Sequence, residues 1–323
     1  MERYVCGVDV GGTTVKIGLF DRQGSIVDKW EVGTDTTDNG INILRDIALS
    51  IKARMADRGI DENDVIGVGI GAPGPVDSVG NIYKAVNLGW GVFNLAEEFS
   101  KVLGGIPVRA GNDANVAALG EMWKGGGTGY RDLVLVTLGT GVGGGVIIDG
   151  NILTGVGGAA GEIGHIHVRE DESESCNCGN CGCLEQYVSA TGIARMARQQ
   201  LAITDQPSRL RSGVVSAKTV FDAVKAGDPL AQVIAEQFGE VLGKALAVIA
   251  NTVNPEAFVI GGGVSKAGNI LFDYIVPYYN KTVFHACRPV KFTLATLEND
   301  AGIYGAAKLV LDYVKVGVES DDQ

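Results

Sequence analysis

The feature that most constrains the fold is a strand–tip–strand pattern that occurs twice. Residues 4–10 and 15–20 are apolar runs of strand length, and they flank a glycine- and threonine-rich tip at 11–14. A second tip, at 139–145, follows the apolar run 133–137 and precedes a β-branched run. Short apolar runs bounded by turn residues are typical of strands, so each pattern predicts a β-hairpin. The repeat is much longer than a solenoid period and indicates two related domains.

Both tips suit the binding of phosphate. Glycines let backbone N–H groups approach an anion closely, and threonine hydroxyls add donors. Either tip alone could be a tight hairpin without a ligand, but two tips favour a nucleotide whose phosphates are held from both sides. Neither tip is a Walker sequence, and the second is followed by a strand, unlike a dinucleotide fingerprint. The residues expected at the phosphates are Gly11, Gly12, Thr13, Thr14, Gly139, Thr140, Gly141, Gly143 and Gly144.

The rest of the chain alternates apolar runs with helical patterns. A length of 323 residues suits two domains. Apolar residues at helical spacing predict a helix that starts at Ile41 and runs to Met55, and Asn94 followed by Glu97 resembles a helix start. Further helices are expected at 112–123, 185–201, 217–226, 229–252 and 300–314, with strands at 65–70, 258–260 and 290–297.

Charge and composition narrow the function classes. The net charge is −11 and no Lys/Arg-rich run occurs, which disfavours a nucleic-acid partner. The longest uncharged stretch, 133–148, is interrupted by glycines and does not predict a membrane helix. The chain leads from Met1 directly into a strand, without the pattern of a signal peptide. We therefore expect a cytoplasmic enzyme with no membrane partner.

A cysteine cluster predicts a metal site. Four of the six cysteines fall within eight residues, at 176, 178, 181 and 183, which favours metal binding over a disulfide framework. With His165 they offer the nitrogen and sulfur ligands of tetrahedral zinc. Three alternatives stay open at this point: four thiols without histidine, His167 in place of His165, or a redox pair of Cys178 and Cys181.

Four carboxylates are candidates for chemistry. Glu162 and Glu185 bracket the cysteine cluster but are not needed by the metal, which suggests a polar small-molecule pocket. Asp113 follows Asn112 at a predicted helix start, where an Asp is usually only an N-cap. It lies between the two tips in the sequence, however, and phosphoryl transfer needs a carboxylate that accepts the attacking hydroxyl's proton. Asp9, at the end of the first strand, suits the orientation of Mg²⁺.

Together these residues closely resemble the repressor/ORF/kinase (ROK) family of sugar kinases, within the actin–hexokinase–Hsp70 superfamily. The most specific signature is Gly161-Glu162-Ile163-Gly164-His165 joined to Cys176-x-Cys178-Gly179-x-x-Gly182-Cys183-x-Glu185. The stretches 86–90 and 112–121 look most like bacterial ATP-dependent glucokinases of that family.

The resemblance implies an α/β fold. Two ribonuclease-H-like domains of the actin/hexokinase type are expected, with mixed sheets flanked by helices and a cleft between them. The small domain would span 1–112 plus about 300–323. The large domain would span 113–299 and carry a zinc-binding insertion at 165–185.

The resemblance also implies an activity, the transfer of the ATP γ-phosphoryl group to the 6-hydroxyl of glucose. Asp113 would be the general base, with ATP, Mg²⁺ and structural Zn²⁺ as cofactors. The sugar-binding residues would be Asn112, Asp113, Glu162, His165 and Glu185. Gly261, Gly262 and Gly263 would lie by the adenosine. Zinc would be held by His165 through its second ring nitrogen with Cys176, Cys178 and Cys183, which leaves Cys181 as an extra thiol. A homo-oligomer, dimer or tetramer, is the family expectation.

Alternatives from the same family remain. The acceptor could be fructose, mannose or an N-acetylhexosamine. A sugar-responsive repressor would carry an N-terminal helix-turn-helix, whereas the first hairpin here begins within ten residues of Met1. A non-catalytic sugar-binding protein is disfavoured because Asp9, Asp113 and both tips are present.

Overall fold

The fold is built on two five-stranded mixed sheets with the same strand order. A computed structural model describes the backbone of residues 3–320 and the side chains up to Val314. In the first sheet, of order β3-β2-β1-β4-β7, the β1–β2–β3 meander is antiparallel, and β4 and β7 continue parallel to β1. Its strands are β1 (Tyr4–Val10), β2 (Thr14–Asp21), β3 (Ile26–Gly33), β4 (Val65–Ala72) and β7 (Val108–Asn112).

The second sheet repeats this arrangement. Its order is β10-β9-β8-β11-β12, in which β11 is parallel to both β8 and β12, and β10 is antiparallel to β9. Its strands are β8 (Leu133–Leu138), β9 (Val142–Ile148), β10 (Asn151–Ile152), β11 (Ala257–Gly261) and β12 (Lys291–Leu294). The predicted repeat and the predicted α/β class are thereby confirmed. A separate small ladder pairs β5 (Asn81–Ile82) with β6 (Phe93–Asn94).

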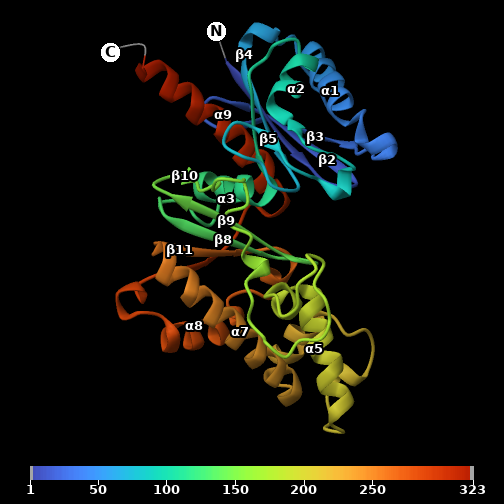
Figure 1. Ribbon diagram of the computed structural model, residues 1–323, viewed down its shortest axis with the longest axis vertical. Coiled ribbons are helices and arrows are strands. Elements are labelled where there is room, and N and C mark those ends of the chain that lie inside the picture. Colours follow the sequence, from blue (N-terminus) through green and yellow to red (C-terminus); the bar gives the residue numbers. More distant parts are fainter. Residues whose placement is uncertain (1–2, 321–323) are drawn as a thin grey trace. The chain divides into compact units, whose positions relative to one another are not determined.

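Helices cover the sheets (Figure 1). They are α1 (Ile43–Asp57), α2 (Leu95–Val102), α3 (Asp113–Lys124), α4 (Glu185–Val188), α5 (Ala190–Ile203), α6 (Ala217–Lys225), α7 (Pro229–Val253), α8 (Ile270–Thr282) and α9 (Ala301–Ser320). Ile41, predicted on the apolar face of the first helix, instead precedes α1, which begins at Ile43, and it is 76% exposed. Helix α8, which carries Pro277 in its interior, was not predicted. None of the described helices is long and apolar enough to span a membrane.

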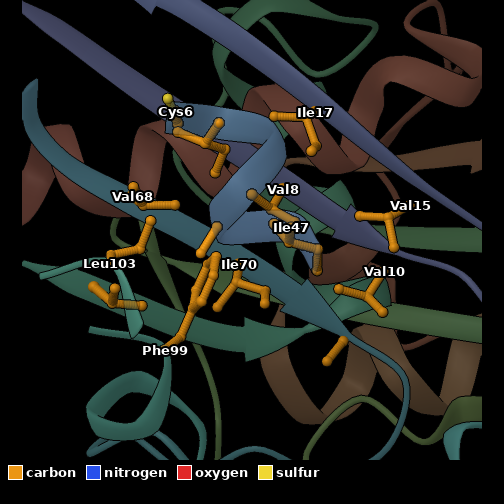
Figure 2. Packing of buried hydrophobic residues seen from close by; sticks show 14 of the residues in the cluster. Cys6, Val8, Val10, Val15, Ile17, Ile47, Val68, Ile70, Phe99 and Leu103 are labelled. Atoms are coloured by element: carbon orange, nitrogen blue, oxygen red, sulfur yellow. The ribbon is translucent and has the colours of Figure 1, made fainter. Parts of the chain in front are cut away.

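The first sheet has a separate core on each face because side chains alternate along its strands. On one face, Val8 and Ile70 pack against Ile47 of α1 and Phe99 of α2 (Figure 2). On the other face, Val5 packs with Ile303 and Ala307 of α9. The same alternation places Asp9 on the α9 face, with Val5.

Glycines bring α9 close to the sheet and to α3. A Cβ at Gly7 would lie 2.0 Å from the Ile303 carbonyl oxygen, and one at Gly69 would lie 1.7 Å from that of Ala306. Gly305 approaches α3 equally closely, since its Cβ would lie 1.7 Å from the Val116 oxygen. Side chains at these positions would push the helices apart, so the sequence fixes a tight β1–α9–α3 stack.

By contacts, the chain divides into two compact units. The first comprises the chain up to Gly129, residues 145–161 and the chain from Leu297 onward, and the second comprises 130–144 and 162–296. This division differs from the domains predicted as 1–112 plus about 300–323 and 113–299. Helix α3 groups with the first unit because it packs on α9, and buried Glu121 of α3 accepts a hydrogen bond from Leu297 N (2.9 Å).

Candidate functional site

At the start of α3, one residue caps the helix and the next residue keeps its carboxylate for another role. Strand β7 ends at Asn112, whose side-chain oxygen accepts from Asn115 N (3.1 Å) and caps the helix. Asp113 is therefore the first helical residue and does not cap it. Its Oδ1 accepts from Ala114 N (2.8 Å) and from the Asn112 side-chain amide (3.0 Å), which fix the carboxylate's orientation. The N-cap interpretation of Asp113 is wrong because Asn112 performs that role.

Asp9 and Asp113 influence each other within the first unit. Burial, and after it the charge of Asp113, raises the pKa of the Asp9 carboxyl from 3.8 to about 6, while the charge of Lys16 opposes the increase. A Cβ at Gly302, near the start of α9, would lie 2.5 Å from the Asp9 carboxyl carbon, so only glycine leaves room for this acid. The close approach of two acids suits a site that receives a cation.

The first tip is a short exposed turn between β1 and β2. Gly11 N donates to Thr14 O (3.1 Å), which closes the turn. Thr34, directly after β3, holds it from outside: its hydroxyl donates to Gly11 O (2.7 Å) and its backbone N to Thr13 O (3.0 Å). Gly12 and Thr13 remain exposed at the end of the turn.

The second tip is shorter than predicted. Gly139 N donates to Gly141 O (3.0 Å), and β9 begins at Val142, so Gly143 and Gly144 lie in the strand rather than in the tip. Strand β9 thus starts four residues earlier than its β-branched run suggested. Thr140 is exposed at the end of the turn, as Gly12 and Thr13 are in the first.

Four side chains of the cysteine loop converge on one point. The ligand atoms of His165, Cys176, Cys178 and Cys183 all lie within 4.8 Å of one another. The His165 Nδ1–Cys176 Sγ distance is 3.7 Å, and the Cys178 Sγ–Cys183 Sγ distance is 3.6 Å. Sulfur ligands about 2.3 Å from a tetrahedral zinc ion stand roughly 3.8 Å apart, so this donor set fits zinc in both chemistry and size.

The rival ligands point elsewhere. His167 Nδ1 lies 3.0 Å from Cys181 O, and its Nε2 lies 3.4 Å from a Glu170 carboxylate oxygen. The Cys181 thiol lies 3.9 Å from the hydroxyl of Ser175. The Cys178 thiol contacts that of Cys183, which favours the metal site over the Cys178–Cys181 redox pair. All six cysteines are free thiols in this structure.

The two spare carboxylates flank this loop. Glu162 Oε2 lies 3.9 Å from His165 Nε2, the ring nitrogen that faces away from the cysteines, and both side chains are accessible. Glu185 starts α4, where its Oε1 lies 3.6 Å from Cys176 Sγ and its Oε2 accepts from Val142 N (2.9 Å). Glu185 therefore joins the cysteine loop to the second tip. The helix predicted over 185–201 breaks at Ser189, which caps α5.

Gly261 ends β11, and Gly262 and Gly263 follow it in a sharp turn. Gly262 has φ +81°, and a Cβ there would lie 2.5 Å from the Leu138 oxygen. Beside this turn, a cavity of about 150 Å³ is lined by Phe221, Val264 and the stems of two lysines, Lys218 and Lys266. An apolar slot of this size can receive a flat aromatic base.

The structure thus groups the predicted residues within each unit. The first unit holds Asn112, Asp113, Asp9 and the first tip, and the second holds the metal ligands, Glu162, Glu185, the second tip and the glycine turn at 261–263. Sequence reasoning missed Thr34, which holds the first tip, and also Ala190 and Thr191, which donate to Gly139 O and Thr140 O of the second tip (both 2.8 Å). Ser189 before α5 is a helix-start signal that could have drawn attention to this segment.

Comparison with known proteins gives the family. The profile of the ROK family matches residues 5–313. A glucokinase of Halalkalibacterium halodurans is 46% identical over 96% of this chain and 95% of its own length, and one of Thermotoga maritima is 36% identical over 95% and 97%. The solved structure of a ROK family glucokinase from Streptomyces griseus in complex with glucose and AMPPNP is 36% identical, with a TM-score of 0.73, and covers 95% of this chain and 98% of that one. Because the family profile matches nearly the whole chain, and both glucokinases are more than 30% identical to it over nearly their full length, this chain belongs to the ROK family.

Proposed function

We propose that this protein is an ATP-dependent glucokinase that transfers the γ-phosphoryl group to the 6-hydroxyl of glucose. The similarity to named glucokinases over nearly the full length supports this function. One observation at the start of α3 carries the mechanism. Asn112 caps the helix, so the Asp113 carboxylate, which is held in one orientation, is not needed as a cap and can act on the substrate.

Asp113 is the general base in this proposal. A sugar hydroxyl is a poor nucleophile until its proton is accepted, and an ionised carboxylate held in one orientation can accept it as the bond to phosphorus forms. The Asn112 amide donates to the same Asp113 oxygen, Oδ1, that also accepts from Ala114 N (3.0 and 2.8 Å). These contacts hold the Asp113 carboxylate in one orientation.

Asp9 would hold Mg²⁺, directly or through water. Bound Mg²⁺ would neutralise charge on the β- and γ-phosphates. Burial and the charge of Asp113 raise the pKa of Asp9 to about 6, so the ionised carboxylate costs more free energy here than in water, and a bound cation would offset that cost. The tips at Gly11–Thr14 and Gly139–Gly141 would donate backbone N–H groups to the phosphates, and Gly261–Gly263 with the adjoining cavity would receive adenosine.

Zinc would be held by His165, Cys176, Cys178 and Cys183, and when bound it would brace the loop without entering the transfer. His165 then has two roles, because Nδ1 faces the thiols while Nε2 faces Glu162. Metal coordination at Nδ1 would fix the tautomer with a proton on Nε2, which makes Nε2 a donor to a sugar hydroxyl. Glu162, Glu185 and Asn112 would bind the remaining hydroxyls.

A coupled assay over a panel of acceptors and donors tests the function. Glucose, mannose, fructose and two N-acetylhexosamines would each be offered with ATP, ADP or polyphosphate. We expect the highest kcat/KM for glucose with ATP, because a pocket that hydrogen-bonds each hydroxyl discriminates strongly against analogues that lack or misplace one. A higher kcat/KM for another sugar would reassign the acceptor. No transfer to any sugar, together with a DNA gel shift, would favour the repressor alternative.

Two further properties belong to this proposal. A cytoplasmic location is supported by the use of ATP and by four unpaired thiols in one loop, which need a reducing compartment to stay metal-competent. A homo-oligomer, dimer or tetramer, stays a prediction, and light scattering on the purified protein would determine its mass.

A further inference from the structure

The second tip is held by the segment that follows the cysteine loop. Ala190 N donates to Gly139 O (2.8 Å), and the Thr191 hydroxyl donates to Thr140 O (2.8 Å). Both donors come from the first turn of α5. Two successive carbonyls of the tip are therefore fixed by residues about 50 positions later in the chain.

Fixing those carbonyls also fixes the donors of the tip. A trans peptide unit points its C=O and its N–H in opposite directions. When the carbonyls of Gly139 and Thr140 turn toward α5, the N–H groups that follow them, on Thr140 and Gly141, turn away from α5. Thr140 is exposed and Gly141 is half-buried, so these two N–H groups are the candidate donors of the tip. Backbone N–H groups that point the same way form an anion site.

We propose that Thr191 is a positioning residue for the phosphates of the donor nucleotide. It acts by orienting the Thr140–Gly141 peptide and does not touch the reacting atoms. This inference rests on the proposed function, because it assumes that the second tip receives a nucleotide.

The hydroxyl of Thr191 is not needed to start the helix. Ser189 is the N-cap of α5, and its Oγ accepts from Gly192 N (3.0 Å). The Thr191 proton goes to Thr140 O, so the Ser189 hydroxyl is the donor in the 2.9 Å contact between the two side chains. Thr191 is also exposed, so loss of its hydroxyl leaves no cavity. Its most consequential contact is the one to the tip.

The test compares two threonine-to-valine substitutions. Thr191→Val removes the bond to Thr140, and Thr252→Val removes a bond of the same length (2.8 Å), from an exposed threonine of α7 to the Val248 carbonyl of the same helix. We expect Thr191→Val to raise KM for ATP about fivefold, the effect of one net hydrogen bond, with kcat and KM for glucose within about twofold of wild type. Thr252→Val should leave all three constants unchanged, and Thr191→Ser should restore KM for ATP.

Calorimetric titration with AMPPNP supplies a readout that does not depend on turnover. The Kd for AMPPNP should rise in Thr191→Val by the same factor as KM. Equal AMPPNP affinity in Thr191→Val and Thr252→Val would overturn the positioning role while leaving the kinase proposal intact. If KM for ATP and KM for glucose rose by the same factor in Thr191→Val, Thr191 would have only a general structural role. A wild-type protein that binds no AMPPNP and phosphorylates no sugar would instead remove the proposed function itself.

Discussion

The two tips resemble each other in sequence but are held in different ways. At the first tip a single residue, Thr34, supplies both outside donors, one from its hydroxyl and one from its backbone. At the second tip the corresponding donors come from two residues, Ala190 through its backbone and Thr191 through its hydroxyl. In both cases a threonine hydroxyl and a backbone N–H fix two carbonyls of a glycine-rich turn.

The two tips differ in the segments that position their outside donors. Thr34 directly follows Gly33, the last residue of β3, so the first tip depends on the hydrogen-bonded meander of its own sheet. The donors of the second tip follow Cys183 and Glu185, and Glu185 also accepts from Val142 N at the tip's end. The first tip is therefore held from within its own sheet, through Thr34 next to β3, whereas the second depends on the conformation of the cysteine loop.

The largest expected effect comes from a change that leaves both tips intact. Asp113→Asn keeps the side-chain oxygen that accepts from Ala114 N but removes the base, so kcat should fall about 10²- to 10⁴-fold. The Kd values for glucose and AMPPNP should stay within about threefold, as measured by calorimetry. A near-normal kcat would remove Asp113 as the base.

Loss of the metal should disturb the second tip and spare the first. Cys183→Ser removes one of the four converging ligands, so we expect zinc to be absent by elemental analysis and the free energy of unfolding to fall by several kcal/mol. KM for ATP should rise as well, because the segment that carries Glu185 and Thr191 loses its anchor.

Cys181→Ser is the matched control for this substitution, since its thiol lies outside the ligand cluster. It should keep stoichiometric zinc and wild-type KM values. The reverse pattern, in which Cys181→Ser loses zinc and Cys183→Ser keeps it, would reassign the fourth ligand. Wild-type protein without zinc would contradict the metal site altogether.

The sequence predicted most of what depends on local pattern. The first two strands, the helix start at Asn94, whose side chain accepts from Glu97 N, and both hairpins follow from short-range rules, and the structure confirms them. The family resemblance was confirmed by the match over residues 5–313. The ligand choice between His165 and His167 could not be made from spacing, because both lie close enough in sequence and only the folded loop turns His167 toward the Cys181 carbonyl.

Contacts between distant segments were outside the reach of sequence reasoning. Thr34 and Thr191 carry no motif that ties them to a glycine tip 20 or 50 residues earlier. The true start of β9 was hidden because Gly143 and Gly144 are poor strand formers, yet they pair within the sheet. The break at Ser189 was missed because the apolar pattern continues through it and the cap depends on side-chain geometry.

Asp9, which lies beside the first tip, should destabilise the folded protein at neutral pH although it is needed for activity. The folded-state pKa of about 6 exceeds the ordinary 3.8, so between these pH values the folded protein binds more protons than the unfolded chain. Stability from this group is therefore present below about pH 4 and is lost as pH rises through 6, by at most about 3 kcal/mol. Without nucleotide and Mg²⁺, Asp9→Asn should unfold at a higher urea concentration than wild type at pH 7.5, with roughly half that gain at pH 5, while kcat falls.

Asp28→Asn on β3 is the control, because its expected effect on stability at pH 7.5 is opposite to that of Asp9→Asn. Although desolvation opposes it, the hydrogen bond from Arg58 (3.0 Å) lowers the pKa of Asp28, so its neutral replacement should destabilise the protein at pH 7.5. If Asp9→Asn also lowered the urea midpoint at pH 7.5, the carboxylate would be stabilised in the folded state, and its proposed readiness for a cation would be wrong.

The substitution with the smallest expected effect on KM for ATP gives the clearest test of how the two tips differ. Thr34→Val removes the hydroxyl bond to Gly11 O but keeps the backbone donor to Thr13 O, so KM for ATP should rise only about twofold, less than for Thr191→Val. Zinc removal by a chelator should then raise KM for ATP in Thr34→Val by the same factor as in wild type, since the two perturbations act on separate supports. In Thr191→Val, zinc removal should raise KM for ATP by a smaller factor, because the Thr191 hydroxyl and the metal both support the second tip through the same segment. Equal chelator effects in both variants would mean that the second tip, like the first, stands independently of the cysteine loop.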